Sequence, residues 1–160
     1  MLIYLFIYTP MKRASSFNTI VGGVSGALPP LIGWAAGDQS LWSLGAWFLF
    51  ALLFLWQMPH FAAINWMYRE EYASGGFKMW SNNDGTGWKT ARIAISFSGL
   101  IFLLGVLFPL FTSMMSWWGA IGGGILGLWM LWVSVRFLKS GDIKDARTLF
   151  FFTLLFSYFV

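Results

Sequence analysis

The sequence predicts an all-α, polytopic transmembrane helix bundle. Hydrophobic residues fill 58% of the 160 positions and charged residues only 10%, whereas soluble proteins carry about 25% charged residues. The apolar residues form six runs, at roughly 1–9, 18–36, 41–68, 93–112, 117–135 and 148–160. All ten Lys and Arg residues lie in the first, third and fifth junctions between these runs. This segregation indicates that the chain crosses a bilayer repeatedly.

The charge pattern also predicts the orientation of the bundle. If each run crosses the membrane once, the three basic junctions share one face, and the positive-inside rule makes that face cytoplasmic. The second and fourth junctions carry no Lys or Arg, while five of the six acidic residues share the basic junctions. We therefore expect a multi-pass protein of the inner (plasma) membrane with its basic loops in the cytoplasm.

Composition excludes several other classes of function. The net charge of +4 comes without a basic stripe or an RNA-reading motif, so we predict no nucleic-acid partner and assign the charge to loops that face anionic lipid. The absence of cysteine rules out disulfides and thiolate chemistry. The N-terminus lacks the basic region and small-residue cleavage pattern of a signal peptide.

The first and last apolar runs are short. They offer 9 and 13 residues, whereas a spanning helix needs about 20. We expect residues 1–160 to be one transmembrane domain that is incomplete at both ends.

Glycines recur at helical spacing in two of the runs. Gly22 and Gly26 form a small-xxx-small pair, and Gly119, Gly123 and Gly127 line one face of a later helix. Such faces let two helices approach closely. We interpret both as packing surfaces.

The third run, 41–68, carries the residues best suited to binding or catalysis. Pro59 predicts a kink, followed by a straight helix from about His60 to Tyr72. On that helix His60 and Glu71 would share a face about 16 Å apart, which puts His60 near mid-membrane. Gln57 would lie one turn deeper, so this face is a candidate polar track into the bundle. An ionisable residue at that depth indicates function, although a neutral His60 bonded to a carbonyl of a neighbouring helix fits equally.

The charged end of this run allows two interpretations. Arg69, Glu70 and Glu71 could simply anchor a helix end in the interface. Alternatively, Glu70 and Glu71 could hold Mg²⁺, which takes one or two carboxylates and shares its other positions with phosphate and water. Lys12 and Arg13, on the same predicted face, would then bind the anion. Together these residues predict a metal-bridged diphosphate site.

Several ordered segments resemble the UbiA family of intramembrane prenyltransferases, and within it the branch that farnesylates protohaem IX (the haem O synthases). They are residues 8–13, 18–19, 26–34, 55–61, 68–73, 76–79 and 146–152. The segments cover nearly the whole chain in the family's order and spacing, so the resemblance is specific. It implies a nine-helix bundle of which this chain supplies roughly the last six helices.

The resemblance also implies an activity and a set of site residues. Such enzymes bind farnesyl diphosphate through Mg²⁺ and transfer the farnesyl group to a vinyl group of haem B, which gives haem O and connects them to terminal-oxidase assembly partners. Tyr8 and Lys12 match a family Tyr-xxx-Lys element, with Arg13 and Arg69 beside the diphosphate. Glu71 stands where the haem-specific members usually carry Asp. A haem and substrate pocket would include His60, Trp56, Gln57 and Asn18.

Three alternatives remain open at this stage. The family's first acidic motif is absent, so we expect this chain alone to be inactive, and a non-catalytic membrane assembly subunit would also fit. A transporter fragment would explain the Gly- and Pro-broken second run, but it predicts an inverted repeat that the sequence lacks. Within the family, the acceptor could instead be an aromatic quinone precursor.

Overall fold

The chain folds into a bundle of α-helices, as the sequence predicted. The computed structural model describes residues 13–37, 39–107 and 117–159, and in these ranges there is no β-strand. Its elements are α2 (Asn18–Gly26), α3 (Leu28–Ala36), α4 (Leu44–Met67), α5 (Arg69–Ser74), α6 (Trp88–Leu107), α7 (Trp117–Ser140) and α8 (Ile143–Phe159).

Four helical stretches in the described ranges are long and apolar enough to cross a membrane. They are Asn18–Ala36, Leu44–Met67, Trp88–Leu107 and Trp117–Ser140. They confirm a helix at each of the predicted runs 18–36, 41–68, 93–112 and 117–135; the third begins five residues earlier than predicted, and residues 108–112 lie outside the described ranges. The predicted run 1–9 lies outside the described residues. The last run forms the C-terminal part of α8, a 17-residue helix. The chain is therefore a membrane protein.

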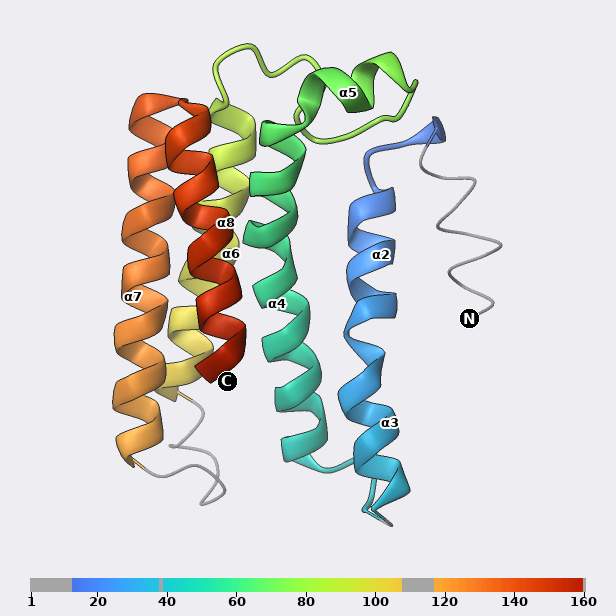
Figure 1. The fold of residues 1–160 in the computed structure, drawn as a ribbon. Coiled ribbons are helices and arrows are strands. Elements are labelled where there is room, and N and C mark those ends of the chain that lie inside the picture. The colour runs from blue at the N-terminus through green and yellow to red at the C-terminus, as the bar shows by residue number, and fades with distance from the viewer. Residues whose placement is uncertain (1–12, 38, 108–116, 160) are drawn as a thin grey trace.

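Helix α4 is the centre of the bundle. Figure 1 shows α4 between the α2–α3 pair on one side and α6, α7 and α8 on the other. Its N-terminus is fixed by Ser43, whose hydroxyl accepts a hydrogen bond from the Ala46 backbone N–H at 3.3 Å. The buried core joins α4, α6, α7 and α8 through side chains that include Ala62, Ala94, Val133 and Leu149.

The glycine-rich run 18–36 forms two short helices that share one direction. The backbone N–H of Ala27 ends α2 by donating to the carbonyls of Gly23 and Val24, and α3 then begins with prolines in its first turn. A Cβ on Gly23 would collide with Met58 Cε, and one on Gly26 would collide with Gln57 Oε1. Glycine therefore allows α2 to lie directly against α4, which confirms the packing interpretation for Gly26.

The second glycine face packs α7 against α6. A Cβ on Gly127 would lie 2.9 Å from the Cα of Phe102, and one on Gly105 would lie 3.6 Å from the carbonyl carbon of Gly123. The two backbones thus meet without intervening side chains. This arrangement confirms the predicted packing role of Gly123 and Gly127.

The structure corrects the predicted helix from His60 to Tyr72. Helix α4 runs without interruption through Pro59 but ends at Met67, and Tyr68 leaves the helical region with φ −110° and ψ 26°. The short helix α5 follows and lies across the end of the bundle (Figure 1). His60 and Glu71 are therefore on two different helices and do not share one helical face.

The α6–α7 contact makes a stability prediction. Gly127→Ala should lower the free energy of unfolding by about 1–3 kcal/mol, because the new methyl group meets the Phe102 backbone, which cannot rotate away. Gly122→Ala on the same helix is the matched control, since its Cβ would meet nothing within 4 Å. Thermal unfolding in detergent measures both. Equal stability of the two variants would contradict the contact.

Candidate functional site

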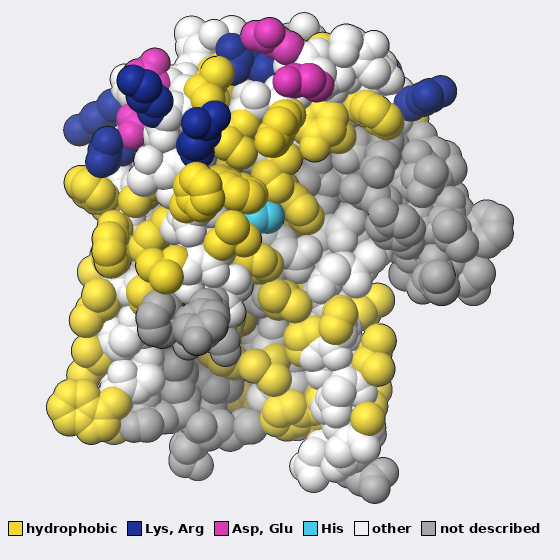
Figure 2. All heavy atoms as spheres, viewed as in Figure 1, with side chains coloured by type: hydrophobic (Ala, Val, Ile, Leu, Met, Phe, Trp, Pro, Cys, Tyr) yellow, Lys and Arg dark blue, Asp and Glu magenta, His cyan; other side chains and the backbone are white. Residues whose placement is uncertain are grey.

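The charged side chains gather at one end of the bundle. Figure 2 shows the visible Lys, Arg, Asp and Glu side chains at the end where α5 lies, above a largely hydrophobic body. The α4–α5 connection and the α7–α8 turn meet at this end, and α2 begins there (Figure 1). This confirms that the three basic junctions share one face of the molecule.

Helix α5 presents the charged motif at this end. The guanidinium carbon of Arg69 lies 4.4 Å from the centroid of the Trp66 ring, and Nη1 donates to the Trp66 carbonyl at 3.1 Å. Its Nη2 is 3.5 Å from Glu70 Oε1, in an ion pair whose Glu70 side chain is 86% exposed. Glu71 is exposed as well. Arg69 is thus anchored, while both carboxylates face the surroundings.

An open, polar cleft lies between α5 and the loop that leads to α6. It has a volume of about 310 Å³ and is lined by Arg69, Glu70, Ala73 and residues 81–85. Its floor is rigid because Asp84 Oδ2 accepts hydrogen bonds from the backbone N–H and the hydroxyl of Thr90, both at 2.8 Å. Ser81 Oγ and Asn82 Oδ1 are buried beside the cleft without hydrogen-bond partners among the described residues.

The carboxylates fit part of a Mg²⁺ site. Glu70 lines the cleft and Glu71 is exposed on the next position of α5, rotated by about 100°. One carboxylate at the cleft suits an ion that takes one or two protein carboxylates and completes its shell with water and phosphate. The described ranges contain no group of three or more His, Cys, Asp or Glu residues that could hold a metal by themselves.

His60 lies between α4 and α8 and is held on three sides. Its Nδ1 is 2.9 Å from the hydroxyl of Thr153. Trp56 stacks on the imidazole with ring centroids 5.4 Å apart, and Phe150 stacks on it with centroids 5.0 Å apart. The side chain is half-buried, and Figure 2 shows it reaching the surface among hydrophobic side chains. The predicted bond to a neighbouring helix is present, with a hydroxyl as the partner.

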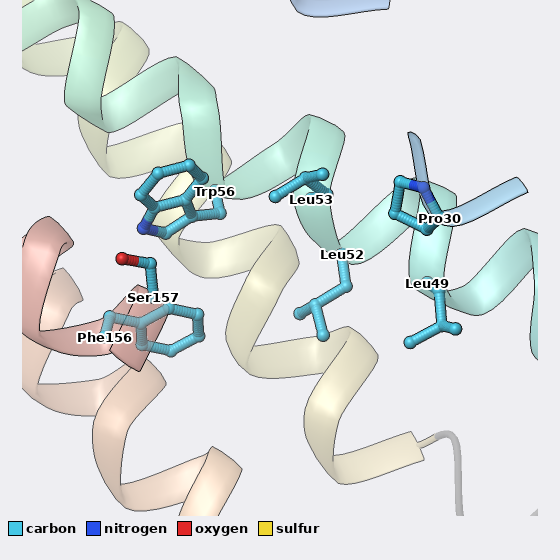
Figure 3. A pocket seen from close by; sticks show the side chains of 7 residues that line it. All are labelled: Pro30, Leu49, Leu52, Leu53, Trp56, Phe156 and Ser157. Carbon is cyan, nitrogen blue, oxygen red and sulfur yellow. The ribbon is translucent and has the colours of Figure 1, made fainter. Parts of the chain in front are cut away.

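Trp56 has two roles in this region. Its Nε1 donates to the Thr153 carbonyl at 2.7 Å. Its ring also lines an apolar pocket of about 140 Å³ between α3, α4 and α8. Figure 3 shows Trp56 beside Phe156 and Ser157 of α8, with Pro30 of α3 at the other end. The predicted place of Trp56 in a haem and substrate pocket stays a prediction.

Gln57 does not continue the polar track predicted for His60. Its side chain is buried, lies against Gly26 of α2 and donates to the Leu53 carbonyl at 3.1 Å. His60, rotated by about 60° from Gln57 on α4, contacts Thr153 of α8. The two side chains therefore meet different helices.

Asn18 ties the start of α2 to the loop after α5. Its Nδ2 donates to the carbonyls of Ser15 and Lys78, both at 2.8 Å, and its Oδ1 accepts from Thr19. Both amide protons are used within the chain, which gives Asn18 a structural contact; its role in a substrate pocket stays a prediction. Arg13 is exposed, and Tyr8 and Lys12 lie outside the described residues.

The residue that sequence reasoning missed is Thr153. It is fully buried in α8 and contacts His60 through its hydroxyl and Trp56 through its carbonyl. A hydroxyl within the apolar stretch 149–156 was a visible signal, since polar side chains inside membranes bond across helices. No feature of the sequence indicates which helix Thr153 contacts.

Comparison with known proteins identifies the family. The profile of the UbiA prenyltransferase family matches residues 1–156. The chain belongs to the UbiA prenyltransferase family. No solved structure matches it.

Similar UbiA-family proteins carry a common name. The chain is 39% identical over 149 residues to a protoheme IX farnesyltransferase of Opitutus terrae, covering 92% of this chain and 50% of that protein. It is 43% identical over 134 residues to one of Salinibacter ruber, covering 84% and 47%. It is 37% identical over 148 residues to a mitochondrial one of Yarrowia lipolytica, covering 90% and 30%. The chain thus spans about half the length of the bacterial relatives, or less.

The arrangement of this UbiA-family chain predicts membrane sidedness. The chain has no cysteine, so single substitutions at the exposed Ser40, Ser74 and Ser140 can be labelled selectively with a membrane-impermeant maleimide. Ser74→Cys and Ser140→Cys should react from the same side, and Ser40→Cys from the other, because α4 alone spans about 36 Å. Labelling of Ser40→Cys and Ser74→Cys from one side would contradict the membrane-spanning arrangement.

Proposed function

We propose that this protein transfers the farnesyl group of farnesyl diphosphate to a vinyl group of haem B, giving haem O. The observation that carries the proposal is the match to the UbiA family over residues 1–156, together with relatives named protoheme IX farnesyltransferase. The geometry supports it because a charged, carboxylate-bearing end lies next to an aromatic, apolar region that contains His60.

The diphosphate would bind at the charged end. Glu70 and Glu71 would hold Mg²⁺, and the metal, when bound, neutralises charge on the leaving diphosphate. Arg69, anchored on Trp66, and Arg13 and Lys12 from the first junction would contribute positive charge to the same group. These residues act by stabilising the charge that develops as the bond breaks.

The transfer itself follows from the chemistry of the two substrates. The allylic C–O bond breaks and diphosphate leaves with the electron pair, so the farnesyl carbon becomes cationic. The terminal carbon of the haem vinyl group donates its π electrons to that carbon. Water adds to the cation left on the haem side and releases a proton, which completes the hydroxyethylfarnesyl group. Apolar side chains such as Trp56 would keep water from the first cation.

The acceptor would lie near His60. His60 is seven residues before the end of α4 at Met67 and Arg69 follows directly after that end, so the axial offset is about 10 Å. This offset separates the polar site for the diphosphate from the apolar site for the haem acceptor. We also infer that the charged end faces the cytoplasm and that the membrane is the inner (plasma) membrane, since basic residues concentrate there.

The test measures haem O formation. The chain spans about half of the length of the Opitutus terrae relative, so it is fused to the part of that relative that it does not match. The fusion protein is assayed in membranes of a host without haem O synthesis. We expect haem B to become haem O on addition of farnesyl diphosphate and Mg²⁺. Turnover of an aromatic quinone precursor with haem B untouched would overturn the choice of acceptor.

The same assay tests the carboxylates. Glu70→Gln combined with Glu71→Gln should lower turnover by about 10²–10³-fold, because removing the groups that stabilise transition-state charge has effects of that size. Asp142→Asn is the matched control, since Asp142 is an exposed acid in the α7–α8 turn at the same end. Unchanged turnover in the double variant would remove the metal assignment.

A further inference from the structure

One threonine hydroxyl determines the protonation pattern of His60. Thr153 Oγ1 donates to the Phe150 carbonyl at 2.6 Å, and the same oxygen is 2.9 Å from His60 Nδ1. A hydroxyl has a single proton to donate. Because Phe150 receives that proton, Thr153 can only accept from His60. The hydrogen of a neutral imidazole must therefore be on Nδ1.

This tautomer leaves a lone pair on Nε2. In a neutral imidazole one nitrogen is a donor and the other an acceptor, and among the described residues Nε2 has no hydrogen-bond partner. Neutral imidazole nitrogen is the commonest metal ligand in proteins, and the ligating histidine usually donates its other N–H to a fixed acceptor. The Thr153 hydroxyl, itself fixed by the Phe150 carbonyl, is such an acceptor.

The surroundings fix the orientation of the ring as well as its tautomer. Trp56 and Phe150 both stack on it, with interplanar angles of 20° and 24°. Trp56 is in turn bonded to the Thr153 carbonyl. The tilted ring of Phe61 is also near, with centroids 6.0 Å apart, so three aromatic rings surround the half-buried imidazole, which Figure 2 shows at the hydrophobic surface. A flat, apolar macrocycle with a central metal matches that setting.

We propose that Thr153 is a positioning residue that holds His60 in the Nδ1–H tautomer and so presents Nε2 to the haem iron as an axial ligand. The inference rests on the proposed function in one respect, the identity of the acceptor as haem. It assigns Thr153 a part in substrate binding beyond the packing of α8 on α4.

Haem titration of the 160-residue chain in lipid nanodiscs tests this role. Thr153→Val keeps the shape of the side chain and the backbone carbonyl that Trp56 needs, but it removes the acceptor for Nδ1–H. Haem B affinity should fall about 10–100-fold, as it does when the partner of a ligating histidine is lost. The iron–histidine stretching band of the ferrous complex should also move to lower frequency. Thr153→Ser should retain both properties.

The controls separate ligation from folding. Thr148→Val removes a hydroxyl that also bonds the backbone of α8 but is exposed and contacts Lys144, so it should leave haem affinity unchanged. His60→Gly should lose the histidine-ligated spectrum and regain it with added imidazole. Thermal unfolding of Thr153→Val shows whether α8 still packs on α4.

Two outcomes would overturn the inference, and both differ from failure of the proposed reaction. The first is that wild type, Thr153→Val and His60→Gly have the same haem spectrum and the same haem affinity. A spectrum without histidine ligation in all three proteins counts as this outcome. The second is haem O formation at the wild-type rate in both variants, which leaves the reaction standing. Thr153-dependent ligation without haem O formation would instead reject the reaction and retain the inference.

Discussion

The structure depends on one constraint: polar side chains within apolar helices are stabilised by hydrogen bonds to neighbouring helices. Thr153 meets this constraint for two residues of α4 at once, through its carbonyl to Trp56 and its hydroxyl to His60. Ser98 and Ser134 do the same between α6 and α7 at 3.1 Å, with Ser134 donating onward to Met130. These bonds set the rotation of each helix, which glycine contacts then allow to pack closely.

The cost of burying polar groups also explains why charged and apolar side chains are separated along the axis of the bundle. Carboxylates and guanidinium groups lie at the end where water and headgroups can solvate them, and α5 carries them across the bundle instead of deeper into it. Below them α4 is apolar except for Gln57, His60 and Asn65 on its inward turns. A reaction that releases a diphosphate while protecting a carbocation needs this division, which connects the physics of the fold with the proposed chemistry.

Much of the architecture was predictable because each membrane helix corresponds to a run of apolar residues in the sequence. The four spanning stretches and the shared charged end followed from hydropathy and the placement of Lys and Arg. The break at Tyr68 did not, because 69–74 continues with residues that favour helix and carry no Gly or Pro. The bend comes from the position of α5 over the bundle, with Arg69 against Trp66. Such a contact is tertiary and has no local signature.

The site was predictable in kind but not in its connections. The depth of His60 marked it as notable, and its neighbours Trp56 and Gln57 were candidates for the same pocket. Only the register of α8 against α4, 93 residues apart in sequence, decided that Trp56 joins His60 at Thr153. Gln57, one residue further along, turned to α2. Neighbouring positions on a helix point about 100° apart, which sends Trp56 towards α8 and Gln57 towards α2. Hydropathy does not predict which neighbouring helix each position faces.

The Thr153 hydroxyl, which donates to the Phe150 carbonyl, holds the proton of His60 on Nδ1. His60 is the one histidine of the chain, so ¹⁵N-histidine labelling gives a single imidazole signal set in solid-state NMR spectra of the protein in lipid bilayers. The account predicts a protonated Nδ1 and a bare Nε2 at neutral pH. A protonated Nε2, alone or together with Nδ1, would contradict it.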